Sequence, residues 1–326
     1  MSPLQFEARH GAEWSALERL LDDIEAGRRA DAAAAARSYR RLCEQLALAQ
    51  ARAYPLHLAE RLDALAHRAH RLIYRTPPRG FAQLADFVRS GFPRRLRSLW
   101  RYVLVATLVF ALPLVAAAIA TRLDPAFALT VLDAPHLSQF DSMYGDETTA
   151  IGRPRDADTD WVMFGYYIRN NISIAFQCFA TGLLAGIGSL FFLAFNGLLM
   201  GAVAGYLDAR GLGHNFWPFV ATHGAFELTA IVIAGAAGLR LGHALLAPGR
   251  ATRSAALKAA ANDGAVLVAG AVVMLAVAAA IEAFWSSARW VAPEVKYGVA
   301  LACWAGVVIY FRRAGRSADE TGGDAR

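Results

Sequence analysis

A histidine and a glutamate lie four residues apart, at His223 and Glu227, in a long apolar stretch of the chain. Residues at this spacing share one face of a helix, so the imidazole could pair with the carboxylate or form a hydrogen bond with it. A charged side chain at the centre of a membrane costs about 3 kcal/mol unless it is paired or hydrated. We therefore treat His223 and Glu227 as candidates for a role in function or in helix packing.

Other polar side chains also interrupt the apolar stretches. Glu282 is a second acid, late in a different apolar segment, with no obvious local partner. Arg240 lies thirteen residues after Glu227, which is about 20 Å along a straight helix. It could reach Glu227 only if the helix breaks, and Gly235 and Gly238 favour a break between these residues. The remaining candidates are Asn171, Asn196 and Arg253.

The spacing of these residues matches no catalytic motif that we can identify. The zinc motif HExxH has two histidines four apart and a glutamate beside the first, whereas here one histidine precedes a glutamate by four positions. The sequence also has no serine elbow, no phosphate-binding loop and no CxxC pair. We predict no catalytic residue, no metal and no cofactor. Three interpretations stay open: polar contacts that fix helix packing, a path for a substrate or ion, and an intramembrane hydrolase, which would require bound metal.

The distribution of charge predicts a membrane protein. The chain has 326 residues, of which 56% are hydrophobic and 18% are charged, against about 25% charged in soluble proteins. The charged residues gather in four regions that leave long uncharged runs between them, a pattern typical of polytopic membrane proteins. Alanine is abundant and favours helices. We expect an all-α polytopic fold that contacts the lipid bilayer and does not bind nucleic acid.

The first hundred residues are expected to lie outside the membrane. Apolar residues at three- and four-residue steps predict a cytoplasmic helical domain over residues 1–80, and a Pro-Gly cluster ends it. Residues 81–101 combine aromatic and basic side chains, which predicts an amphipathic helix at the membrane surface. The transmembrane domain is expected over 102–311, with an acidic loop at 122–160 and a tail at 312–326.

The long uncharged run 172–207 has to turn, since one crossing needs only about 20 residues. Asn196 and Gly197 are the expected turn, followed by a short arm that is re-entrant or part of a broken helix. We expect broken or re-entrant helices between Asn196 and Leu246. Basic residues precede the first span, lie in the 248–258 loop and follow the last span. Because basic residues favour the cytoplasmic side, both termini are predicted to be cytoplasmic. This requires an even number of crossings, four to six.

A set of short motifs is spread along the chain: Asn170-Asn171-Ile172, Asn196-Gly197, His223-Gly224-x2-Glu227-Leu228, AGAAGLRLG at 234–242, Pro248-Gly249-Arg250-x2-Arg253 and Ile281-Glu282-x-Phe284. Together these motifs resemble the stage II sporulation protein M family of bacterial membrane proteins, over nearly the whole chain. The resemblance implies a scaffold in the cytoplasmic membrane rather than an enzyme. The family's namesake works in a complex that remodels peptidoglycan, and members in bacteria that do not sporulate, which this chain is similar to, often lie beside genes for an ATPase.

The sequence therefore predicts an integral scaffold of the cell envelope in the bacterial inner membrane, linked to peptidoglycan remodelling. It would present a helical domain to cytoplasmic partners such as an ATPase and an acidic loop to envelope proteins. Closely spaced glycines between 182 and 205 predict tight helix contacts, which we expect to support a homodimer. The alternative is a transporter or a lipid-handling protein built around the buried histidine and glutamates.

Overall fold

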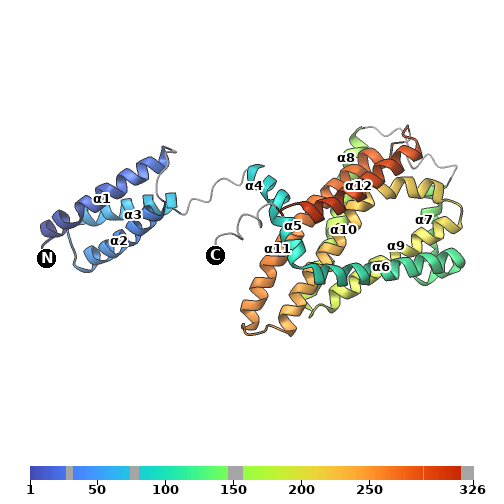
Figure 1. Ribbon diagram of the computed structural model, residues 1–326, viewed down its shortest axis with the longest axis horizontal. Helices are drawn as coiled ribbons and strands as arrows, with labels where there is room; N and C mark the ends of the chain where they lie inside the picture. The colour runs from blue at the N-terminus through green and yellow to red at the C-terminus, as the bar shows by residue number, and fades with distance from the viewer. Residues whose placement is uncertain (27–31, 74–80, 146–156, 289, 317–326) are drawn as a thin grey trace. The chain divides into compact units, whose positions relative to one another are not determined.

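The computed structural model describes residues 1–26, 32–73, 81–145, 157–288 and 290–316 (Figure 1). The chain divides into two compact units, Met1–Gln83 and Leu84–Arg326. The regular secondary structure of the described residues is entirely helical, so the predicted all-α fold class is confirmed.

The first unit consists of three helices: α1 (Pro3–Glu25), α2 (Ala32–Ala51) and α3 (Leu56–Ile73). Ser2 starts α1 with a capping box, in which its side chain accepts from the Gln5 amide and the Gln5 side chain reaches back. The apolar residues at three- and four-residue steps form one core, in which Phe6 and Trp14 are fully buried. The indole of Trp14 donates to Gln45 Oε1 at 2.6 Å, which satisfies its buried N–H.

The second unit begins with three short segments, followed by long helices joined by short turns. The short segments are α4 (Phe81–Asp86), the π-helix η1 (Phe87–Gly91) and α5 (Phe92–Ser98). The long helices are α6 (Trp100–Leu123), α8 (Ala157–Ala180), α9 (Ile187–Ala209), α10 (Gly213–Leu246), α11 (Arg253–Ala280) and α12 (Pro293–Arg313). Smaller elements are η2 (Pro125–Thr130), α7 (Ala134–Tyr144), η3 (Thr181–Leu183) and the π-helix η4 (Ile281–Ser286).

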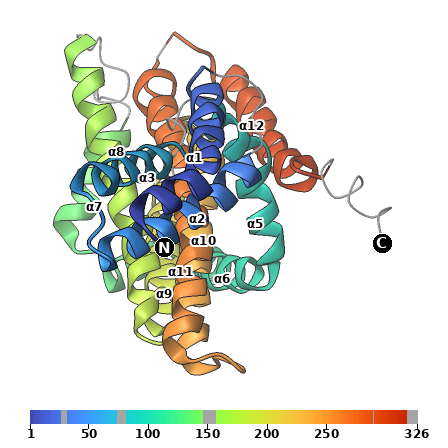
Figure 2. The same cartoon turned by 90° about the vertical axis from the view of Figure 1, so that its left-hand side faces the viewer.

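Five of these helices are long and apolar enough to cross a membrane: α6, α9, α10, α11 with η4, and α12. Helix α10 is the most buried of the five and packs against α9 and α11 (Figure 2). Helix α6 carries a row of exposed apolar residues, including Leu112 at 65% exposure. This is the arrangement expected when the outer helices of a bundle face lipid and a central helix faces protein.

The expected turn at Asn196 and Gly197 is wrong. The chain turns earlier, at Thr181–Gly186, where Gly186 has a φ of +85°, and α9 continues through both residues. The side-chain amide of Asn196 finds a hydrogen-bond partner within α9, because it donates to the Phe192 carbonyl oxygen at 2.8 Å. A Cβ at Gly197, Gly201 or Gly205 would clash with a carbonyl oxygen of α6. The glycines therefore bring α9 against α6 (Figure 1), rather than ending a helix.

The expected break in α10 is also wrong, because the helix is continuous from Gly213 to Leu246. Gly238 and Gly242 let the helix approach the end of α8 and the turn after it, where a Cβ would strike the Cys178 carbonyl oxygen and the backbone of Gly186 respectively. The break was expected at Gly235 and Gly238, but the space at these glycines is filled by neighbouring residues, Leu193 at Gly235 and Ser189 at Gly238.

Residues 81–101 are helical and amphipathic. Phe92 and Leu96 are buried, while Arg94 and Arg95 on the other side are exposed. The apolar side faces other helices of the unit: Phe92 makes an edge-to-face contact with Phe311 of α12 at 5.5 Å between ring centres. Arg97 also donates to the carbonyl oxygens of Phe311 and Ala314. A position at the membrane surface stays a prediction, but the segment is anchored to α12.

Candidate functional site

The buried cluster is formed by three side chains from two helices. His223 and Glu227 lie one turn apart on α10, and Glu282 lies on η4, the π-helical continuation of α11. One ligand atom from each residue can be chosen so that all three lie within 4.8 Å of one another. His223 Nε2 is 3.8 Å from Glu227 Oε2, and the two side chains are 6% and 13% exposed.

The shared face of His223 and Glu227 is the relationship that their spacing predicts. The sequence named Glu282 as a buried acid but could not predict that it joins them, because the contact depends on how α11 packs against α10. The cluster therefore unites three of the seven candidate residues.

A hydrogen-bonded network orients the other edge of the imidazole. His223 Nδ1 lies 3.1 Å from Ser286 Oγ, and Lys296 Nζ donates to the Ser286 carbonyl oxygen at 2.8 Å. Thr222 Oγ1 in turn donates to the Lys296 carbonyl oxygen at 3.4 Å. All four residues are buried.

Ser286, Lys296 and Thr222 were missed by sequence reasoning. Helix α12 already begins at Pro293, and Lys296 in its first turn is only 7% exposed. The available signal was Lys296 itself, one of only two lysines in a chain whose other basic residues are all arginine or histidine.

In the part of the chain that the structure describes, the two carboxylates have no basic partner other than His223. Within the described residues, neither Glu227 nor Glu282 accepts a hydrogen bond or pairs with a lysine or arginine. The nearest buried amine, that of Lys296, is engaged by the Ser286 carbonyl. Two acids thus lie close together in an apolar bundle, and the described residues do not supply the compensation that buried carboxylates normally require.

Aromatic side chains close the cluster on the side of α7. The Phe219 ring meets the His223 imidazole edge to face, 5.5 Å between centres, and Tyr144 packs against Phe219 at 6.2 Å. Burial raises the pKa of the Tyr144 phenol above its usual range, and the negative charge of Glu282 adds to this shift. Tyr144 therefore lies within the electrostatic reach of Glu282, so α7 is close to the cluster.

Arg240 belongs to a different polar group. Its Nε lies 3.3 Å from Asp263 Oδ2 on α11, and Arg95 Nη1 of α5 lies 2.9 Å from the other oxygen of Asp263. Because α10 is unbroken, Arg240 stays far along the helix from Glu227. Asp263 was not among the predicted residues.

In the described residues, none of the three remaining candidates is paired or hydrogen-bonded with a member of the cluster. Asn171 is buried and accepts from its neighbour Asn170 at 3.1 Å, while its own Nδ2 has no partner in the described residues. Asn196 bonds within α9. Arg253 is the exposed first residue of α11, next to the Thr252 cap.

The fold and the site define an all-helical polytopic membrane protein with a buried polar cluster. Residues 105–287, more than half of the chain, match the family of Stage II sporulation protein M, and this range contains the whole cluster. The chain belongs to this family, as its motifs predicted. Residues 4–75 match a domain of unknown function, DUF8413. Neither the curated proteins nor the solved structures gave a match.

Proposed function

We propose that this protein is a non-enzymatic scaffold in the bacterial inner membrane that holds cell-envelope partners on both faces of the bilayer. The observation that carries the proposal is the three-helix unit Met1–Gln83, which has a complete core of its own. A folded unit of this kind, attached to a membrane bundle, is suited to bind a partner outside the membrane, such as an ATPase.

The second face would be presented by η2 and α7. These elements have their own small core with the ends of α9 and α10, including Ala128, Leu137 and Tyr144. Asp141 of α7 accepts from Tyr206 of α9 at 2.8 Å and faces Arg210 at 3.5 Å. The loop between α6 and α8 is thus partly folded onto the membrane bundle, and it offers an acidic surface to envelope proteins, including those that remodel peptidoglycan.

The positions of the basic residues support cytoplasmic termini. Exposed arginines precede α6, follow α10 and end α12, and such residues favour the cytoplasmic side. We propose that α8, with 24 residues, crosses in addition to the five candidate spans. Six crossings place both termini on one side and the acidic loop on the other.

A homodimer, if formed, needs a surface other than the glycines of α9, because these are covered by α6. Helix α12 offers the alternative, since Gly298, Ala302 and Gly306 recur every four residues and are exposed. Small residues at this spacing allow close contact between helices. We propose this face for self-association.

Site-specific photocrosslinking in native membranes tests the scaffold. A crosslinker at exposed Leu48 of α2 should capture a cytoplasmic protein, and one at exposed Leu129 of η2 should capture an envelope protein. A crosslinker at Gly298 should capture a second copy, whereas one at Leu112 of α6 serves as the lipid-facing comparison. Failure of Leu48 and Leu129 to capture any protein would count against the scaffold.

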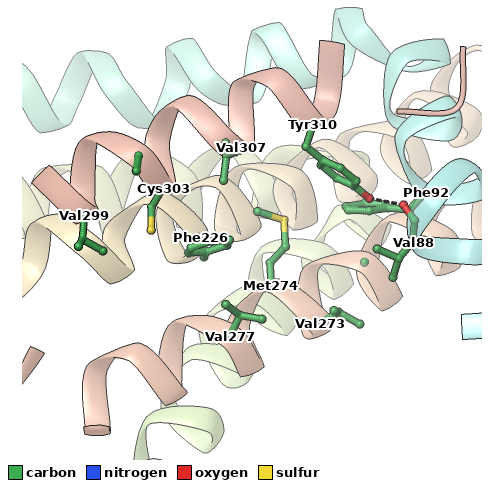
Figure 3. Close-up of a pocket in the computed structure, with 13 residues that line it drawn as sticks. Val88, Phe92, Phe226, Val273, Met274, Val277, Val299, Cys303, Val307 and Tyr310 are labelled. Atoms are coloured by element: carbon green, nitrogen blue, oxygen red, sulfur yellow. Dashed lines mark hydrogen bonds between the residues drawn. The ribbon is translucent and has the colours of Figure 1, made fainter. Parts of the chain in front are cut away.

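The alternative, a transporter or lipid-handling protein, is favoured by one further observation. An apolar cavity of about 520 Å³ lies between α10, α11, α12 and the segment before α6 (Figure 3), a volume within the usual range of ligand sites. Phe226, Met274 and Cys303 line it, and Tyr310 closes one end by donating to the Val88 carbonyl oxygen at 2.6 Å. Its apolar lining suits an acyl chain.

This alternative predicts a measurable flux. Purified protein in liposomes should move a lipid or an ion, and Glu227→Gln, beside Phe226, should abolish this movement while the protein remains folded. If Glu227→Gln only lowers the thermal stability, a packing role is favoured instead. Native mass spectrometry should also show a retained lipid that is lost when Gly306, on the cavity wall, is replaced by Phe.

A further inference from the structure

We propose that His223, Glu227 and Glu282 bind one divalent transition-metal ion, with zinc as the best fit. The inference is independent of the scaffold role and of the apolar cavity. Imidazole nitrogen and carboxylate oxygen are both zinc ligands, and one atom from each of the three residues lies within 4.8 Å of the others.

The distances suit an ion at the centre of the three groups. Zinc binds histidine nitrogen and carboxylate oxygen at about 2.1 Å, so two ligands of a tetrahedral ion lie about 3.4 Å apart. His223 Nε2 and Glu227 Oε2 are 3.8 Å apart, slightly wider than this value and too far for a hydrogen bond. A bound ion would draw the three side chains together by about 1 Å, a change within the reach of side-chain rotation.

The imidazole is held in the manner of a metal ligand. When His223 Nδ1 carries the proton and donates to Ser286 Oγ, 3.1 Å away, Nε2 turns an unprotonated lone pair toward Glu227. Metal-binding histidines generally donate their second ring nitrogen to such a partner, which fixes the orientation of the ring. Lys296 holds the backbone of Ser286 in place through its carbonyl oxygen. Ser286 and Lys296 are therefore positioning residues.

Charge balance favours a cation over an empty cluster. Two carboxylates and a neutral imidazole carry a charge of −2, which one divalent ion cancels. Neither Glu227 nor Glu282 pairs with a lysine or arginine in the part of the chain that the structure describes. A protonated His223 could neutralise the charge of at most one of the two carboxylates. A neutral site is far less costly than two uncompensated acids among apolar helices.

The backbone at Glu282 is consistent with a built site. Glu282 and Ser286 both lie on the π-helix η4, where α11 departs from regular α-helical geometry. Such π segments are rare and occur frequently at functional sites. Here the π segment carries the second acid of the cluster together with the partner of His223.

Three protein ligands leave one position of a tetrahedral ion open. Structural zinc sites normally use four protein ligands, whereas sites that exchange or activate a ligand keep one position for water or substrate. The proposal therefore places an ion with one exchangeable ligand beneath Phe219 and Tyr144. The competing explanation is a proton shared by the two glutamates, which would require no metal.

The test measures metal content in the full-length protein. The protein is purified in mild detergent through a tag without histidines, incubated with Zn²⁺, passed through a desalting column and analysed by elemental analysis and native mass spectrometry. We expect about one zinc per chain in the wild type and in Glu294→Gln, which removes an exposed glutamate of α12. Glu227→Gln and Glu282→Gln should each weaken zinc binding at least tenfold.

Two further measurements keep the result decisive. Zn²⁺ should raise the melting temperature of the wild type and of Glu294→Gln but not of Glu227→Gln. Co²⁺ should give the intense visible absorption of a tetrahedral site in the first two proteins but not in Glu227→Gln. If the variants fail to fold, the wild type still decides: less than a tenth of an equivalent of zinc overturns the proposal. Equal zinc in Glu227→Gln and Glu294→Gln would also overturn it. A wild type that takes up no zinc, together with a Glu227→Gln that is more stable than the wild type, identifies the shared proton.

Discussion

Ser286 Oγ lies 3.1 Å from Nδ1 of His223 and, in the described residues, is the only side-chain group within hydrogen-bond distance of this imidazole. Ser286→Ala removes the hydrogen-bond acceptor but leaves all three proposed ligands in place. Loss of such a partner typically weakens metal binding 10–100-fold, so we expect the zinc dissociation constant to rise by about tenfold or more. Competition with a chromophoric chelator measures the change.

A purely structural role of Ser286 makes a different prediction. Ser286→Ala would then lower the melting temperature equally with and without Zn²⁺, and the dissociation constant would not move. Ser286→Thr retains the hydroxyl and should restore zinc affinity to near the wild-type value. Ser287→Ala is the matched control, because that hydroxyl donates to the Ala283 carbonyl oxygen within its own helix.

The contact between α6 and α9 depends on the absence of side chains at three positions. A Cβ at Gly201 would meet the carbonyl group of Leu114 in the facing helix, so even Gly201→Ala forces the two backbones apart. Overpacking of this kind costs about 1–3 kcal/mol, and we expect at least that loss of unfolding free energy. Reversible unfolding in mixed detergent measures it. Gly165→Ala on an exposed face of α8 should change stability by no more than about 0.5 kcal/mol.

Asp263 links three helices through two arginines, Arg240 of α10 and Arg95 of α5. The group is partly exposed, with side-chain exposures of 17% for Asp263 and 22% for Arg240, so the pairing energy is reduced by solvent screening. We expect Arg240→Gln to destabilise the bundle by about 1 kcal/mol. Its zinc content should remain that of the wild type, because Arg240 lies outside the cluster.

A double-mutant cycle separates the ion pair from other effects of the substitution. If the pair stabilises the bundle, Arg240→Gln should cost much less in the background of Asp263→Asn than in the wild type. Equal costs in both backgrounds would show that the methylene stem of Arg240, rather than its charge, packs against α11.

The sequence predicts the features that depend on neighbours along a helix, and it fails where a residue's role is set by another helix. The i, i+4 relationship of His223 and Glu227 follows from helix periodicity, and the apolar runs predict the spans. Gly197 and Gly238 were assigned to a turn and a break, because a glycine in the sequence allows left-handed backbone, a break or close contact equally well. Only the carbonyl groups of Phe110 and Cys178, which lie against Gly197 and Gly238 respectively, show that contact is the reason.

The same limit explains the site. Glu282 reaches His223 because α11 packs on α10 and because its last turn is π-helical. Neither fact has a pattern in the chain that periodicity could detect. Lys296 lies just before the apolar run of the last span, where a charged residue usually ends a loop. Burial of the Lys296 side chain depends on Ser286, ten residues earlier, because the Ser286 carbonyl oxygen accepts a hydrogen bond from the Lys296 ammonium group.

The three-helix unit carries a pH-sensitive ion pair between α1 and α3. Arg68 donates to Glu25 at 2.6 Å and to Asp22 at 2.5 Å, and this hydrogen bonding by the guanidinium lowers the pKa of the Glu25 carboxyl. A lowered pKa in the folded state means that the stabilisation is fully present above the ordinary pKa of 4.5 and is lost as the pH falls through the lowered value. Arg68→Gln should therefore destabilise α1–α3 at pH 7, and its difference from the wild type should shrink below about pH 4. Hydrogen exchange of α1–α3 in the full-length protein measures this difference.

Arg19→Gln, which removes a contact to the Ser15 carbonyl within α1, is the control and should show no such pH dependence. A difference for Arg68→Gln that stays constant from pH 7 to pH 3 would mean that the arginine stabilises the unit by packing rather than by charge.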